Sequence, residues 1–147
     1  MKSPYGPLLS LRELEEKQAE ACLADALHEV GLAESALTTA RDARDAWLQY
    51  YLDEEPGAID ATGLSAMIAR LETSERDAAQ RLEAALRRAD EARTALLERR
   101  RDREAVQTLH TDLLEAMARE SARRQQAELD ELGGVSANVR KEASDAR

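Results

Sequence analysis

The stretch Asp53-Glu54-Glu55-Pro56-Gly57 decides the fold, because it separates two long segments that share one helical pattern. A helix does not easily cross this stretch, since proline lacks a backbone N–H and clashes with the preceding turn. On each side, mostly apolar residues recur at alternating steps of three and four, which is the period of a coiled coil. We call these two runs the seam. The first run is Leu23, Ala26, Val30, Ala33, Leu37, Ala40, Arg44, Trp47 and Tyr51, and the second is Leu64, Ile68, Leu71, Glu75, Ala78, Leu82, Ala85, Ala89, Ala92 and Leu96.

The two runs match in residue type when the chain is folded back at this stretch. Leu37 then lies opposite Leu82, the alanines lie opposite alanines, and Arg44 lies opposite Glu75. Opposite charges at facing seam positions select register and orientation. The sequence therefore predicts an all-α fold, a monomeric two-helix antiparallel coiled-coil hairpin. A disordered chain is the rival interpretation, and the sustained period argues against it.

Capping and stop signals predict the bounds of a single hairpin over residues 1–147. The first helix is expected at about 8–54, starting at Pro7 or at Ser10, which forms a capping-box pattern with Glu13. A turn is expected at 55–62, with Thr62 as the next cap, and a second helix at about 63–132. Gly133-Gly134 predicts the end of that helix and a flexible tail at 133–147. The second helix is thus longer and projects past His110 without a partner for about 20 residues, or roughly 30 Å.

Composition excludes several classes of function. Of 147 residues, 35% are charged and 3% aromatic, as in long helices rather than in globular enzymes. A net charge of −9 argues against non-specific nucleic-acid binding. Cys22 is alone, His28 and His110 lack partners at metal spacing, and no apolar run has membrane-span length. We therefore expect a soluble cytosolic protein with no catalytic residue, metal or cofactor.

Apolar side chains outside the seam predict partner surfaces. The projecting part carries Leu113, Leu114, Met117, Leu129 and Leu132, and an isolated helix with exposed leucines requires another protein to cover it. Near the predicted turn, Tyr50 and Met67 lie off the seam and favour a second contact.

Three segments of the chain resemble the FliJ/YscO (SctO) family of flagellar and type III secretion systems. Met67-Ile68-Ala69-Arg70-Leu71-Glu72 is similar to the family's aromatic-Ile-x-x-Leu-Glu segment, with Met67 at the aromatic position. Gln126-Ala127-Glu128-Leu129-Asp130-Glu131 is similar to its Gln-rich stretch, and Leu8–Lys17 to its N-terminal pattern.

The resemblance implies a cytoplasmic stalk located beside the inner membrane at the secretion apparatus. Such stalks insert both chain termini into the pore of the hexameric secretion ATPase, promote its assembly and couple it to the export-gate membrane protein through that protein's cytosolic domain. Some also bind export chaperones. The implied ATPase-binding residues are Leu8, Leu11, Leu14, Leu113, Met117, Arg123, Arg124 and Leu129.

The implied gate-binding residues are Met67, Leu71, Ser74 and Ala78. Leu71 and Ala78 are also seam positions, which favours Met67 and Ser74 as the exposed contacts. Two alternatives stay open: an export chaperone or adaptor that grips partner helices without entering the ATPase, and a structural spacer. A spacer has no need of exposed leucines.

Overall fold

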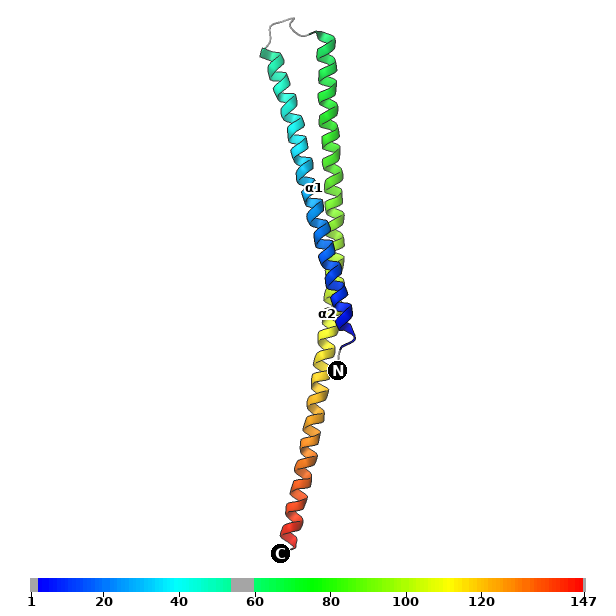
Figure 1. Cartoon of the computed structure of the whole chain (residues 1–147), viewed down its shortest axis with the longest axis vertical. Helices are drawn as coiled ribbons and strands as arrows, with labels where there is room; N and C mark the ends of the chain where they lie inside the picture. The colour runs from blue at the N-terminus through cyan, green and yellow to red at the C-terminus, as the bar shows by residue number, and fades with distance from the viewer. Residues whose placement is uncertain (1–2, 54–59, 147) are drawn as a thin grey trace. The chain divides into compact units, whose positions relative to one another are not determined.

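The protein, described from a computed structural model over residues 3–53 and 60–146, consists of two helices within those ranges. Helix α1 spans Tyr5–Asp53 and helix α2 spans Ala61–Asp145, with 49 and 85 residues respectively (Figure 1). Their contacts form two units. The hairpin unit lies within Leu14–Arg101, and the terminal unit comprises the described residues 3–13 and 102–146.

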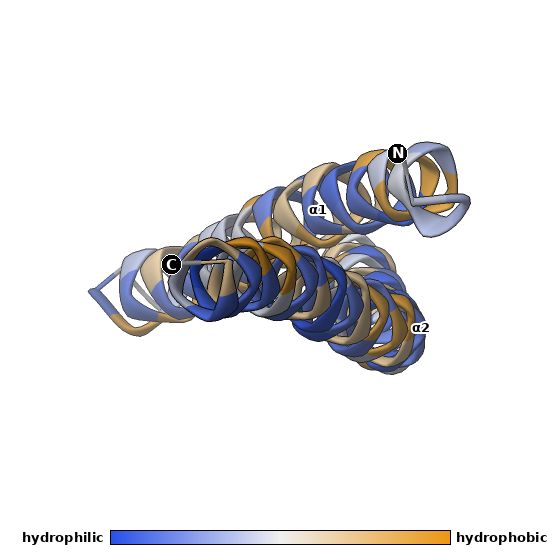
Figure 2. Ribbon diagram, turned by 90° about the horizontal axis from the view of Figure 1, so that it is seen from below, coloured by the Kyte–Doolittle hydropathy of each residue, from blue (hydrophilic) through white to orange (hydrophobic). Residues whose placement is uncertain are grey.

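The hairpin unit confirms the all-α fold and the predicted register. Val30 of α1 packs with Ala85 and Ala89 of α2, which are only 2% and 1% exposed. Further along, Leu37 and Ala40 pack with Ala78, and Leu82 adjoins both clusters. Alanine at these positions lets two helices approach closely, so the core is thin and dominated by small side chains. Hydrophilic residues recur along both helices beside the hydrophobic ones (Figure 2).

Ion pairs join α1 to α2 in two places within the hairpin unit. Glu75 accepts from Arg44 at 2.5 Å and from Arg41 at 3.4 Å, as the facing seam charges predict. The pKa of Arg44 is raised above its ordinary value, first by its hydrogen bond to Asp45 and next by the charge of Glu75. In the second place, the three acidic partners lie on α1 and the two arginines on α2: Glu15–Arg99 at 3.5 Å, Glu16–Arg100 at 3.3 Å and Glu20–Arg100 at 3.7 Å.

The start of α1, in the terminal unit, differs from the prediction. The helix begins at Tyr5 rather than at about residue 8, and Ser3, not Ser10, caps it. The Tyr5 backbone N–H donates to Ser3 Oγ at 3.2 Å, the bond expected of an N-cap serine. Pro4 and Pro7 are tolerated because the first helical N–H groups have no partner within the helix.

Ser3 also joins α1 to α2 within the terminal unit. Its Oγ lies 2.9 Å from His110 Nδ1, and the residue is only 9% exposed. Val106, one turn earlier on α2, is buried. The contact at His110 therefore fixes where the first turn of α1 lies along α2.

The predicted end of α2 is wrong. The helix does not stop at about 132 but continues through Gly133-Gly134 to Asp145, so residues 133–145 are helical rather than a flexible tail. Neither glycine adopts the left-handed conformation that a glycine cap requires. Glycine lowers helix propensity by about 1 kcal/mol but does not forbid helical dihedrals.

The other end of α2 lies close to its predicted position. The helix begins at Ala61, two residues before the predicted 63, and the Asp60 carbonyl accepts its first bond, from Leu64 N–H at 2.9 Å. Asp60 thus takes the capping position that the sequence predicts for Thr62. Most of the predicted turn at 55–62, including Pro56-Gly57, lies outside the described residues. Among those that are described, no helix is both long and apolar enough to cross a membrane.

Candidate protein-binding surfaces

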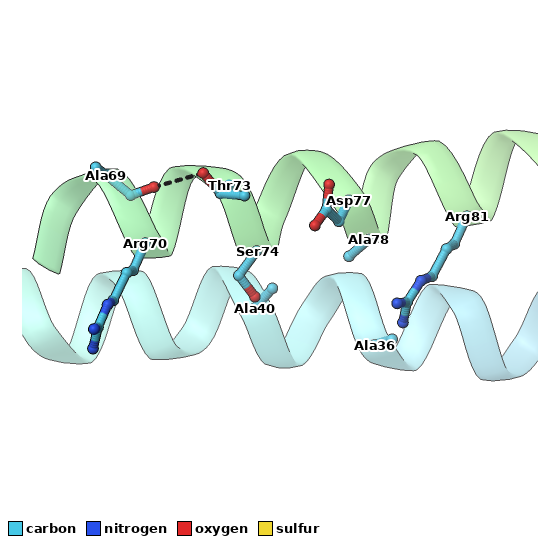
Figure 3. A pocket seen from close by; sticks show the side chains of 9 residues that line it. All are labelled: Ala36, Ala40, Ala69, Arg70, Thr73, Ser74, Asp77, Ala78 and Arg81. Atoms are coloured by element: carbon cyan, nitrogen blue, oxygen red, sulfur yellow. Dashed lines mark hydrogen bonds between the residues drawn. The ribbon is translucent and has the colours of Figure 1, made fainter. Parts of the chain in front are cut away.

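A shallow groove of about 550 Å³ runs between α1 and α2 in the hairpin unit (Figure 3). Its floor is made of alanines from both helices, because small side chains repeat along the seam and beside it. We call it the alanine groove, and its lining residues are Ala36, Ala40, Ala69, Arg70, Thr73, Ser74, Asp77, Ala78 and Arg81.

Charged side chains border the alanine groove. Arg70 and Arg81 extend from α2 across α1 at its two ends, while Asp77 stays beside α2 between them (Figure 3). Neither arginine forms an ion pair with any residue of the described ranges. Thr73 Oγ1 donates to the Ala69 carbonyl at 2.8 Å, so its hydroxyl is engaged within the helix. The groove therefore offers an apolar floor with a cationic group at each end.

The four predicted gate-binding residues do not share one surface. Ser74 and Ala78 line the alanine groove, but Ala78 is only 6% exposed and belongs to the packed seam. Leu71 lines a separate hollow of about 160 Å³ together with Arg44, Leu48, Ile68 and Glu72. Met67 is half-buried and lines neither hollow. Ser74 is thus the most accessible of the four.

Aromatic side chains near the end of α1 lie both on the seam and beside it, and the seam residue Tyr51 is 38% exposed. Trp47 and Tyr51, both seam residues, stack with ring centroids 5.8 Å apart and planes within 3°. Tyr50, which lies off the seam, is 58% exposed. Tyr50 therefore presents an aromatic surface that a partner could cover.

The predicted ATPase-binding residues are mostly found in the terminal unit. Leu8, Leu113 and Met117 are half-buried there, whereas Leu11 and Leu129 are exposed. Leu14 is also exposed, but it belongs to the hairpin unit. Arg123 is exposed, and Arg124 Nε lies 3.2 Å from Glu120 Oε1 of the same helix.

From residue 118 to residue 145, every position of α2 is exposed. A hollow of about 420 Å³ opens at the start of this stretch, lined by Ala116, Met117, Glu120, Ser121 and Arg124. Beyond it, Leu129, Leu132, Val135 and Val139 are each 59–67% exposed. We call residues 118–145 the exposed segment of α2. It is a helix with apolar side chains and no covering element in the described chain.

Sequence reasoning missed Val135, Val139 and the two arginines of the groove. The valines follow Leu132 at steps of three and four, but this spacing indicates a helical face only if the helix continues through Gly133-Gly134, which the sequence predicts as its end. Arg70 and Arg81 carry no sequence signal of their own, since most arginines on a charged helix are solvated or paired. The positions of Arg70 and Arg81 point to a binding surface only once the structure shows that both arginines border the alanine groove.

The exposed side chains on these surfaces are suited to protein–protein contacts. Among the residues that the structure describes, no group of His, Cys, Asp and Glu is placed to hold a metal ion. The surfaces present exposed leucine, valine, tyrosine and arginine side chains on rigid helices, which are the residue types that mediate protein–protein contacts.

Comparison with known proteins supplies the family. Neither a curated protein nor a solved structure matches the chain. The model of one family, described as the flagellar FliJ protein, matches residues 1–142, nearly the whole chain and both helices. The chain therefore belongs to the FliJ family.

Proposed function

We propose that this protein is a stalk that binds the central pore of the hexameric secretion ATPase, promotes assembly of the hexamer and couples it to the export gate. Membership of the FliJ family implies a non-enzymatic component of a flagellar or type III export apparatus. The ATPase, the cytosolic domain of the gate protein and export chaperones are the proposed partners. The protein acts in the cytoplasm, at the inner-membrane face of the apparatus, and is a monomer in isolation.

One observation carries this proposal: the exposed segment of α2 holds four large aliphatic side chains in water. Leu129, Leu132, Val135 and Val139 recur at steps of three or four, so they gather along one side of the helix. Burying each of them against a partner contributes about 1.5–3 kcal/mol. A single helix is also narrow enough, at about 10–12 Å with its side chains, to enter a pore lined by a protein ring.

The test is stimulation of a purified hexameric secretion ATPase by the full chain. Leu129→Ser with Leu132→Ser should raise the concentration of the protein needed for half-maximal stimulation by at least about a hundredfold, because two apolar contacts worth about 3–6 kcal/mol together are lost. Leu97→Ser is the matched control, since Leu97 is 53% exposed but lies in the hairpin unit. Full stimulation by the double variant, or by a chain that ends at residue 118, would contradict the stalk function.

A chaperone or adaptor is the second candidate function. The exposed Tyr50 ring and the alanine groove favour it, because both belong to the hairpin unit, whereas the exposed segment belongs to the terminal unit. An adaptor would lose partner binding on Met67→Ala and tolerate truncation after about residue 118. A stalk has the reverse sensitivity, so the two variants separate the candidates.

A further inference from the structure

We infer that the alanine groove binds an acidic helix of a partner protein, with a small-residue face toward the groove and two carboxylates placed to meet Arg70 and Arg81. The inference rests on the proposed function only in one respect: Ser74 and Ala78, which line the groove, belong to the predicted gate-binding residues. The inference adds the charge and the side-chain size of the partner's contact face, which the exposed segment of α2 does not determine.

The shape of the groove favours a helix as the occupant. Two antiparallel helices leave a furrow along their line of contact, and a third helix packs into such a furrow through its own ridge of side chains. The floor residues Ala36, Ala40, Ala69 and Ala78 have no side chain beyond Cβ. A partner helix can therefore approach closely only if the face that it presents is also made of small residues.

The charges of the groove select an acidic partner. Arg70 and Arg81 are eleven positions apart on α2, or about 16 Å. Both extend over α1 and neither has a carboxylate partner within the described residues (Figure 3). A helix lying along the groove reaches both guanidinium groups with carboxylates about three turns apart.

Asp77 restricts where the partner helix can carry its negative charges. It lies between the two arginines, so a carboxylate at the centre of the partner would face a like charge. The favoured partner is acidic at both ends of its contact and neutral or basic in the middle. This pattern distinguishes it from a uniformly acidic segment and from a nucleic-acid backbone, which carries negative charge at every step.

The probe is a stapled, alanine-rich helical peptide with two glutamates eleven positions apart and no carboxylate between them. Its binding to the full chain is measured by fluorescence anisotropy at low and at physiological salt. We expect binding that weakens as salt rises. A peptide with glutamine in place of both glutamates should bind about tenfold more weakly.

Variants of the chain complete the test. Arg70→Glu with Arg81→Glu should weaken binding of the glutamate peptide by at least tenfold. Arg87→Glu is the matched control, because Arg87 is exposed on the same helix but does not line the groove. Circular dichroism melting confirms that each variant remains folded.

Several outcomes overturn the inference. Equal binding of the glutamate and glutamine peptides, or binding that survives the double reversal, removes the charge argument. If sedimentation shows that the chain dimerises and the double reversal abolishes the dimer while the peptide does not bind, the occupant is a second copy. Stimulation of the secretion ATPase, measured on the same variants, should be unchanged. The groove inference and the stalk function can thus fail separately.

Discussion

Ser3 is the residue on which the start of α1 depends. It accepts the Tyr5 N–H as an N-cap, and the same hydroxyl contacts His110 of α2. Ser10 looks like the better cap in the sequence because Glu13 follows it at capping-box spacing. In the structure Ser10 lies inside α1 and donates to the Gly6 carbonyl at 3.2 Å. The capping serine is thus the one that also contacts His110, a contact that sequence spacing does not reveal.

Replacing Ser3 with alanine should lower the free energy of unfolding by about 1.5–2.5 kcal/mol, because the cap and the His110 contact are both lost. Urea denaturation measures the free energy, and hydrogen exchange should show earlier opening of the first turn of α1. Ser10→Ala is the matched control and should be close to neutral. Equal effects of the two variants would mean that Ser3 is not the cap.

At the scale of the elements, α1 and α2 pack through alanine rather than through large side chains. Ala85 and Ala89 are the most buried residues of the hairpin unit, and the next turns are filled by Val30, Leu37 and Leu82. Such a seam tolerates little added volume, since the helices are already close.

Ala89→Leu should destabilise the hairpin by about 1–3 kcal/mol through overpacking. Ala79→Leu adds the same volume at an exposed position of α2 and should change stability by less than about 0.5 kcal/mol. Thermal melting followed by circular dichroism compares the two. A neutral Ala89→Leu would show that the helices are farther apart than the seam requires.

Gly133 and Gly134 are the weakest point of α2 as an element. No atom lies within 4 Å of a Cβ added at either position, so alanine fits without rearrangement. Each glycine-to-alanine substitution should stabilise the helix by about 0.5–1 kcal/mol. Hydrogen exchange of residues 135–145 should slow in the double variant while exchange in the hairpin unit stays unchanged. Unchanged exchange at 135–145 would mean that the glycines do not limit this part of the helix.

At the scale of the whole molecule, much of the fold could be predicted from the sequence. The pairing of Leu37 with Leu82 and of Arg44 with Glu75 is predicted by the matched residue types at facing seam positions, and the structure confirms it. The end of α2 could not be predicted, because glycine weakens a helix without forbidding it. The groove could not be predicted either, since it arises from two helices whose residues are distant in the chain. Of the predicted gate-binding set, Ser74 and Ala78 share this groove but Leu71 and Met67 do not line it.

The hairpin itself can be tested by cross-linking. Cysteines at Leu37 and Leu82, in a chain that also carries Cys22→Ser, should form a disulfide within one chain. The product should therefore migrate as a monomer on a non-reducing gel. Cysteines at Leu37 and Leu97 are the control pair and should remain reduced. Disulfides formed only between chains would identify a domain-swapped dimer.

The spacing of alanine along the seam has a mechanical consequence. If one helix of the hairpin unit slid along the other by seven residues, Ala33 would still meet an alanine, so small-residue packing offers little resistance to shear. The Arg44–Glu75 pair and the Glu16–Arg100 pair would both have to break in such a slide. A force applied along one helix is therefore passed to the other through these ion pairs as well as through the Leu37–Leu82 contact. The stiffness of the hairpin under axial load should fall as ionic strength rises, even where its helicity does not.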